Sequence, residues 1–239
     1  PQRPASWEKN VTAFYKGLDT LGVAYERIKV PYGEHHLNAV YYPGPAGAET
    51  KPLIVFVGGF DSTLEELYFA LTAAALERGY SVLTYEGPGQ GSVLRKQNLP
   101  FTYEWEKPNS AVLDTFLQGH AKPTNIVLVG MSMGGYLAPR AAAFDERIDG
   151  VVAYDVFYDL TAAPQWPETA FWLRDNGFGF LVNALIGIRI SLSPGFAWAV
   201  DNAMWTAGAT TPLDAFESFR PYTLEHVASQ IRSEVLILA

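Results

Sequence analysis

The 239-residue sequence contains no cysteine and only four histidines. Without cysteine there are no disulfide bonds and no thiolate metal sites, and the absence fits a reducing, cytoplasmic compartment. No histidine-rich cluster is present either, so we expect no metal and no cofactor. A formal net charge of −8 argues against nucleic acid or an anionic membrane as partner, whereas a homodimer remains an open alternative. The longest apolar candidate for a membrane span, residues 178–193, is too short and contains Asn183 and Arg189.

Hydrophobic residues make up 49% of the chain, which is enough for one sizeable core. Near-continuous apolar runs separated by helical segments predict a mostly parallel sheet with helices on both faces. The expected strands are 26–30, 37–42, 53–57, 81–85, 126–129, 151–154 and a buried strand at 235–238, the first two forming a hairpin. The expected helices are 6–21 with Ser6 as N-cap, 62–78, 108–119, one after residue 134 and one from Thr223.

The most informative stretch is the apolar run at 126–129 with the segment Gly130-Met131-Ser132-Met133-Gly134 that follows it. This is G-x-S-x-G between a predicted strand and a predicted helix, the context in which the motif has a mechanical meaning. The tight turn lifts the serine side chain clear of the sheet, at a helix N-terminus that favours developing negative charge. The alternative is a glycine-rich turn that merely contains a serine. The flanking strand and helix favour the first interpretation, so we predict that Ser132 is a nucleophile.

Two further glycine-rich turns follow predicted strands, at the sheet edge where working loops lie. In the turn 58–63, Ser62 and Glu65 have the spacing of a capping box, so a helix is expected to start there. We predict that the N–H groups of Phe60 and Met133 form an oxyanion hole, the alternative being an ordinary capped turn. We interpret the turn 86–91 as structural support, because no Lys-Ser or Lys-Thr follows to indicate phosphate binding.

Three motifs in chain order resemble those of the α/β-hydrolase superfamily: Gly-Gly-Phe-Asp-Ser-Thr at 58–63, Tyr-Glu-Gly-Pro-Gly-Gln-Gly at 85–91 and Gly-Met-Ser-Met-Gly-Gly at 130–135. More narrowly, the chain is similar to the branch containing 2,6-dihydropseudooxynicotine hydrolase and the fungal polyketide-shortening hydrolases of pigment and secondary metabolism. Residues 64–69 and 105–108 strengthen the fungal comparison. The resemblance implies an α/β-hydrolase fold, an N-terminal helical region, a helical cap and a Ser-acid-His triad. Several members cleave carbon–carbon bonds next to a ketone.

On this resemblance, residues 1–24 are expected to be the tail of the helical region, 25–159 with 221–239 an incomplete hydrolase core, and 160–220 the cap. The sequence begins with Pro1 rather than Met and ends on an apolar run, so we expect it to be trimmed at both ends. The triad aspartate and histidine are then expected beyond Ala239. The cap segment is rich in aromatic residues, most of which we expect in its own core and the rest around an apolar pocket: Trp166, Phe171, Trp172, Phe178, Phe180, Phe196, Trp198 and Trp205.

Within the chain, Asp155 follows the strand 151–154 at the active edge and is the alternative triad acid, although a capping or solvated role competes with this interpretation. Asp159 has a weaker case. None of the four histidines is expected to be the triad base: His35, His36, His120 and His226.

The sequence therefore predicts a serine hydrolase that attacks a carbonyl and forms an acyl-enzyme. The expected substrate is an aromatic or polyketide ketone cleaved at a carbon–carbon bond. A carboxylesterase or peptidase of the same fold, and an inactive hydrolase fold used for binding, remain alternatives.

Overall fold

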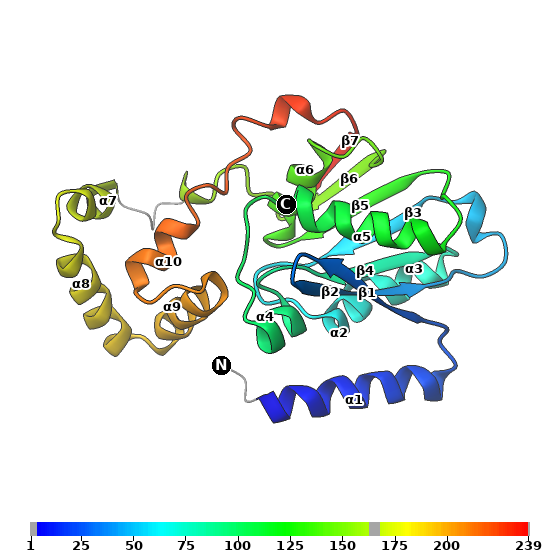
Figure 1. Ribbon diagram of the computed structural model, residues 1–239, viewed down its shortest axis with the longest axis horizontal. Helices are drawn as coiled ribbons and strands as arrows, with labels where there is room; N and C mark the ends of the chain where they lie inside the picture. Colours follow the sequence, from blue (N-terminus) through cyan, green and yellow to red (C-terminus); the bar gives the residue numbers. More distant parts are fainter. Residues whose placement is uncertain (1–3, 163–167, 239) are drawn as a thin grey trace.

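The computed structural model describes residues 4–162 and 168–238. At its centre is a seven-stranded sheet with the order β1-β2-β4-β3-β5-β6-β7 (Figure 1). Antiparallel pairs join β1 to β2 and β2 to β4, and the remaining pairs are parallel. The strands are β1 (Glu26–Tyr32), β2 (His35–Tyr42), β3 (Leu53–Val57), β4 (Val82–Glu86), β5 (Ile126–Met131), β6 (Gly150–Tyr154) and β7 (Glu234–Leu238). The predicted mostly parallel sheet is confirmed.

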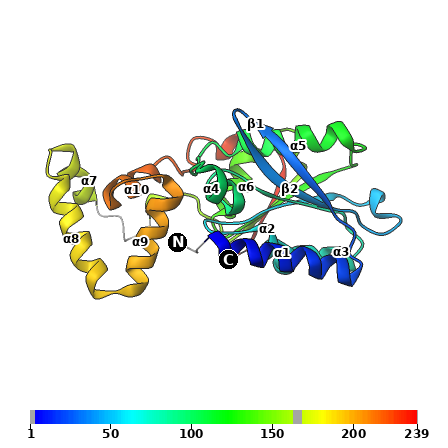
Figure 2. The same ribbon diagram turned by 60° about the horizontal axis from the view of Figure 1, so that its bottom comes forward.

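The sheet separates two apolar cores, because side chains alternate between its faces. Val55 and Val57 point into the larger core, whereas Phe56 points into the smaller one. Figure 2 shows the helices on the two faces. The larger core is covered by α4 (Gly91–Gln97), α5 (Glu106–Gly119) and α6 (Gly134–Ala142). The smaller core is covered by α1 (Pro4–Leu21), α2 (Leu64–Leu67), the π-helical turn Tyr68–Thr72 and α3 (Ala73–Glu77).

Three predicted helix starts are wrong. The helix α1 begins at Pro4, so Ser6 lies inside it and is not its N-cap; proline is well suited to a first helical turn. The N-cap of α2 is Thr63, which accepts a hydrogen bond from the Glu66 N–H at 3.4 Å, because the Ser62 hydroxyl is already bonded to the Gly59 N–H. No α-helix starts at Thr223; a turn there leads into the short 3-10 helix Ala228–Gln230.

The prediction of a buried strand at 235–238 is correct for the strand and wrong for its burial. β7 is an edge strand paired with β6, and its residues Val235 to Leu238 are 41–57% exposed. Both faces of β7 are open among the described residues. An apolar run indicates a strand suited to burial, but burial also needs an element that covers it.

Four helices lie together beside the sheet, as Figures 1 and 2 show: α7 (Glu168–Asp175), α8 (Gly179–Leu192), α9 (Pro194–Ala207) and α10 (Pro212–Ser218). The chain enters and leaves this helical group through two segments that run side by side. The Leu160 N–H donates to the Tyr222 carbonyl at 3.0 Å, and the Leu224 N–H donates to the Tyr158 carbonyl at 2.8 Å. The helical group also contacts the core directly, through the Phe101 N–H and the Thr206 carbonyl at 2.9 Å.

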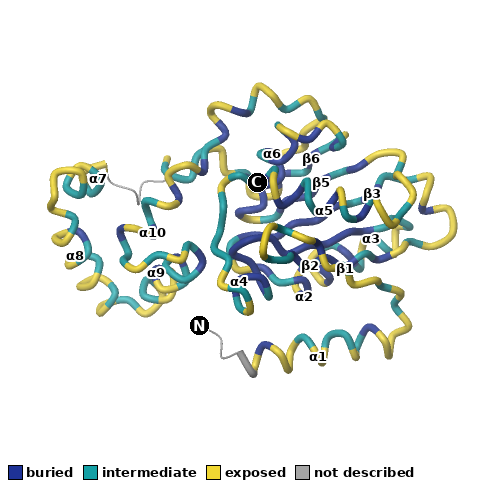
Figure 3. The backbone as a smooth tube through the Cα atoms, viewed as in Figure 1, coloured by how far each residue is buried: buried dark blue, intermediate teal, exposed yellow. Residues whose placement is uncertain are grey.

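The aromatic residues of the helical group are less buried than predicted. Trp172, Phe178, Phe180 and Trp198 are exposed, and Trp166 lies outside the described residues. The helix α8 is apolar around its whole circumference, so packing one side against its neighbours leaves the other in solvent (Figure 3). None of the described helices is both long and apolar enough to cross a membrane.

The direction in which the chain adds strands to the sheet reverses at β3. From β3 the chain moves to β4 on one side and then crosses back to β5 on the other. In open α/β sheets, ligands bind at the carboxyl ends of strands where the order reverses in this way. The turn 58–63 follows β3 and the turn 130–134 follows β5, so both glycine-rich turns meet at this point.

Candidate active site

Ser132 lies in the turn between β5 and α6 with a left-handed backbone, at φ 57°. Left-handed conformations are unfavourable for residues other than glycine and concentrate at functional sites. The turn is fixed on both sides: the Ser132 N–H donates to the Tyr154 carbonyl at 2.9 Å, and the Gly135 N–H donates to the Ser132 carbonyl at 2.7 Å. Ser132 is exposed while Met133 and the start of α6 are buried, so the hydroxyl stands clear of the packed elements.

The sharpness of this turn depends on Gly130. A Cβ atom added to Gly130 would lie 1.9 Å from the Gly134 carbonyl oxygen, a backbone atom that cannot move aside. The strand β5 and the helix α6 therefore approach each other as closely as two backbones can. The G-x-S-x-G spacing therefore has a direct steric cause at Gly130.

Gly59 brings the turn after β3 against the serine. A Cβ atom added to Gly59 would lie 3.0 Å from the Ser132 Oγ and 3.1 Å from the Met133 nitrogen. The backbone at Gly59 therefore packs directly against Ser132 and the residue that precedes α6. An oxyanion hole needs backbone N–H groups held this close to the nucleophile. Sequence reasoning named the neighbouring Phe60 and missed Gly59, although the glycine pair at 58–59 marked a close approach of backbones.

A cavity of about 230 Å³ opens beside Ser132 between the sheet and the helical group. Apart from Ser132, the described residues of its lining are apolar and four of the seven are aromatic: Phe60, Met133, Phe157, Leu160, Ala203, Phe216 and Phe219. The Phe60 ring lies 5.8 Å from the Phe219 ring, centroid to centroid. None of the seven described aromatic residues of the predicted set is in this lining, which draws instead on Ala203 and Phe216 of the helical group and on the segments beside it.

A buried carboxylate supports the turns around Ser132. Glu86, at the end of β4, accepts hydrogen bonds from the Leu64 N–H at 3.1 Å and the Ser92 N–H at 2.8 Å, and also from the Ser92 hydroxyl. Burial raises the pKa of Glu86, and the bonds from Ser92 act in the opposite direction. This one side chain therefore holds the first turns of both α2 and α4. The helix α4 was not predicted, because the glycine-rich sequence before it indicated only a loop.

Asp155 follows β6 at the same edge as Ser132, since Met131 pairs with Tyr154 in the sheet. Its backbone is left-handed at φ 65°, its N–H donates to the Leu238 carbonyl at 2.9 Å, and it is exposed. Asp159 has a local role: one of its carboxylate oxygens accepts hydrogen bonds from the N–H and the hydroxyl of Thr161, both at 2.7 Å.

The four histidines lie elsewhere. His35 and His36 are in β2, on the far side of β4 and β3 from Ser132. The His120 ring stacks on Phe116 at 4.2 Å and its Nε2 lies 3.0 Å from a Glu26 carboxylate oxygen, whereas His226 lies in the turn before the short 3-10 helix. None of them lines the cavity at Ser132.

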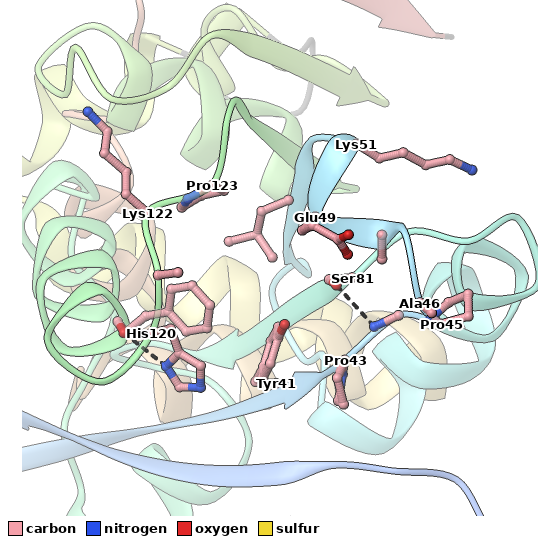
Figure 4. A pocket seen from close by; sticks show the side chains of 15 residues that line it. Tyr41, Pro43, Pro45, Ala46, Glu49, Lys51, Ser81, His120, Lys122 and Pro123 are labelled. Atoms are coloured by element: carbon pink, nitrogen blue, oxygen red, sulfur yellow. Dashed lines mark hydrogen bonds between the residues drawn. The ribbon is translucent and has the colours of Figure 1, made fainter.

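A second cavity, of about 310 Å³, lies at the opposite edge of the sheet (Figure 4). Tyr41, Ser81, His120 and Lys122 are among its lining residues, and it borders the amino ends of β3 and β4. Parallel sheets bind ligands at their carboxyl ends, so this cavity is not where the chemistry is expected. Among residues 4–162 and 168–238 no cluster of three or more histidine, aspartate or glutamate residues could hold a metal ion.

Comparison with known proteins agrees with this geometry. A family model described as "Alpha/beta hydrolase family" matches residues 54–238. The chain is 34% identical to the hydrolase acrC of Aspergillus aculeatus and 32% identical to the 20-hydroxy-prefusarin hydrolase FUS2 of Gibberella moniliformis, in each case over 99% of this chain and 60% of the relative. The crystal structure of 2,6-dihydroxy-pseudo-oxynicotine hydrolase aligns with a TM-score of 0.73 at 22% identity, covering 97% of this chain and 57% of that one. The chain thus spans about 60% of the length of the curated relatives it matches.

Proposed function

The chain belongs to the alpha/beta hydrolase family, and on that premise we propose that it is a serine hydrolase of fungal-type secondary metabolism that acts on a small carbonyl compound. One observation carries the proposal. Ser132 is exposed on a left-handed turn and lines one apolar cavity together with Phe60 and Met133. A substrate carbonyl in that cavity lies beside a nucleophile and beside the two residues whose N–H groups we propose as hydrogen-bond donors.

The proposed reaction begins with attack of the Ser132 Oγ on the carbonyl carbon while a base removes the hydroxyl proton. The N–H groups of Phe60 and Met133 stabilise the negative charge that develops on the carbonyl oxygen. Collapse of the tetrahedral intermediate breaks the bond to the leaving group, which takes up a proton, and leaves an acyl-enzyme. Water then attacks the acyl group, releasing a carboxylic acid and the free serine.

The base in this scheme is proposed to be a histidine other than the four in this chain, since none of those lines the cavity. Asp155 is the alternative acid to orient such a histidine. It is exposed, lies at the carboxyl edge of the sheet and is one strand away from Ser132. The other candidate for the acid is an aspartate that precedes this histidine in the sequence, as the Ser-acid-His order of this fold requires.

The helical group α7–α10 is proposed to act as a cap that shapes the substrate site. Ala203 and Phe216 belong to it and lie on the same cavity as Ser132. Because no charged side chain is among the described residues of the lining, the acyl part of the substrate is proposed to be neutral and apolar, and aromatic rings suit a wall of this kind. Carbon–carbon cleavage would follow where an adjacent ketone stabilises the departing carbanion.

A fluorophosphonate probe tests the nucleophile. The protein as expressed from its natural gene is expected to be labelled on Ser132, because such probes react with activated serines and spare merely exposed ones. Mass spectrometry of the labelled peptide identifies the residue, and heat-unfolded protein is the control. If the folded protein is labelled no faster than the unfolded one, the fold serves binding and not hydrolysis.

Substrate preference distinguishes a carbon–carbon hydrolase from a carboxylesterase. We expect an aromatic β-diketone to be cleaved faster than a short p-nitrophenyl ester, because only the diketone fills an apolar site of about 230 Å³. Comparing kcat/KM for the two compounds measures this. If the ester is cleaved tenfold faster or more, the protein is a carboxylesterase and the carbon–carbon hydrolase proposal is wrong.

A further inference from the structure

Gln90 is a buried glutamine in the loop between β4 and α4, only 1% exposed and outside the lining of the Ser132 cavity. Its side-chain NH₂ group donates two hydrogen bonds, to the carbonyls of Gly58 and Gly59, both at 2.9 Å. Its side-chain oxygen accepts from the Gly87 N–H, also at 2.9 Å. Both amide protons of Gln90 are therefore used on the single turn that faces the serine.

These bonds control the direction of a backbone N–H. The Gly59 carbonyl and the Phe60 N–H belong to one planar trans peptide unit, in which they point in opposite directions. Holding the carbonyl toward Gln90 therefore turns the Phe60 N–H away from Gln90. The preceding peptide unit is held at both ends, since the Gly58 carbonyl is bonded to Gln90 and the Gly59 N–H donates to the Ser62 hydroxyl at 2.8 Å.

The N–H groups of Phe60 and Met133 have no hydrogen-bond acceptor among the described residues. An oxyanion hole needs N–H groups that have no other acceptor. Such an N–H has no hydrogen bond of its own to fix its orientation. Oxyanion donors are effective because they are held in place before the charge develops. Gln90 supplies that restraint from behind the turn, through the opposite end of the same peptide unit.

We propose that Gln90 is the positioning residue of the oxyanion turn, fixing the Gly58 and Gly59 carbonyls so that the Phe60 N–H points at the substrate oxygen. The inference rests on the proposed function and adds to it the residue that orients one of the two donors. Gln90 touches neither substrate nor serine. Its effect is therefore expected in the transition state, where the oxyanion exists, and not in the binding of the uncharged substrate.

The test is Gln90→Glu, which keeps the size of the side chain but replaces the NH₂ donor by an acceptor. We expect kcat to fall about 10- to 100-fold, since a misdirected donor loses much of its contribution, with KM changed by less than about threefold. A trifluoromethyl ketone, which binds as a tetrahedral oxyanion, should lose affinity by the same factor as kcat/KM. An alcohol analogue of the substrate, which forms no such anion, should bind as before.

Gln97 provides the matched control. It is also a glutamine of the α4 region, and its side chain makes two bonds to the His36 backbone, at 2.9 and 2.7 Å, away from the Ser132 turn. Gln97→Glu should lower thermal stability without changing the ratio of ketone to alcohol affinity. If Gln90→Glu does not fold, Gln90→Leu removes the same two donors without adding charge.

The outcomes are separable. Unchanged kcat in a folded Gln90 variant, or a loss confined to KM, overturns the positioning role. Equal weakening of the ketone and the alcohol shows that Gln90 only holds the structure together and also overturns it. If the unaltered protein neither hydrolyses the substrate nor reacts with the fluorophosphonate, the proposed function itself fails, before Gln90 is in question.

Discussion

Replacing Ser132 by alanine is expected to abolish hydrolysis, with a loss of about 10⁶-fold in kcat, the scale seen when a serine nucleophile is removed. No other hydroxyl lines the cavity among the described residues, so nothing can take over the attack. The measurement is turnover of the β-diketone or the p-nitrophenyl ester, whichever the unaltered protein cleaves faster. Ser229→Ala, at an exposed serine of the 3-10 helix Ala228–Gln230, is the control and should retain full activity.

The same position also allows a stability measurement. Ser132 has a left-handed backbone, which costs a side-chain-bearing residue roughly 1 kcal/mol relative to glycine. Ser132→Gly is therefore expected to be inactive and more stable than Ser132→Ala, by about 1 kcal/mol in the free energy of unfolding. Residual activity above a few per cent in either variant would show that Ser132 is not the nucleophile.

Gly59→Ala is expected to have the second largest effect, a fall of about 10³-fold in kcat/KM, comparable to the loss of an oxyanion-hole donor. The added methyl group would lie 2.9 Å from the Ser132 Cβ, 3.0 Å from its Oγ and 3.1 Å from the Met133 nitrogen, so the nucleophile and the start of α6 would have to shift. The φ angle of Gly59 is not in the left-handed range, so its backbone tolerates alanine and the effect is steric. Fluorophosphonate labelling should slow in parallel, because the probe reacts with the same displaced hydroxyl.

Gly17→Ala is the control for this substitution. Gly17 lies within α1 and an added methyl group meets nothing within 4 Å, so activity should be unchanged and stability should rise by up to about 1 kcal/mol. A Gly59→Ala enzyme that keeps more than a tenth of its kcat/KM would show that the close packing of Gly59 against Ser132 is not needed for the reaction.

The sequence was sufficient for the parts of the fold that depend on local pattern. The strands at 53–57 and 126–131 are continuous apolar runs. Each is followed directly by a glycine-rich turn, and glycine permits the sharp change of direction that occurs there. Ser132 could be identified because its G-x-S-x-G motif lies between a predicted strand and a predicted helix. The confirmed parallel sheet follows from the alternation of such strands with helices.

The parts that could not be predicted depend on contacts between distant residues. Ser62 has the spacing of a helix cap, but its hydroxyl is engaged by Gly59, and Thr63 caps the helix instead. The apolar run at 235–238 does not reveal that its strand is at the edge of the sheet. The roles of Glu86 and Gln90 are equally hidden, because their partners lie some 20 to 30 residues earlier in the chain.

The paired segments 158–160 and 222–224 have a consequence for how proteins of this kind can diversify. The two connections to the helical group are bonded to each other, so the ends of everything between them are already adjacent. A segment inserted between adjacent ends can be lengthened, shortened or exchanged at little cost in chain entropy, and without altering the order of the strands. Grafting residues 161–221 from one relative onto the sheet of another should therefore transfer the choice of substrate while the reaction chemistry stays with the recipient.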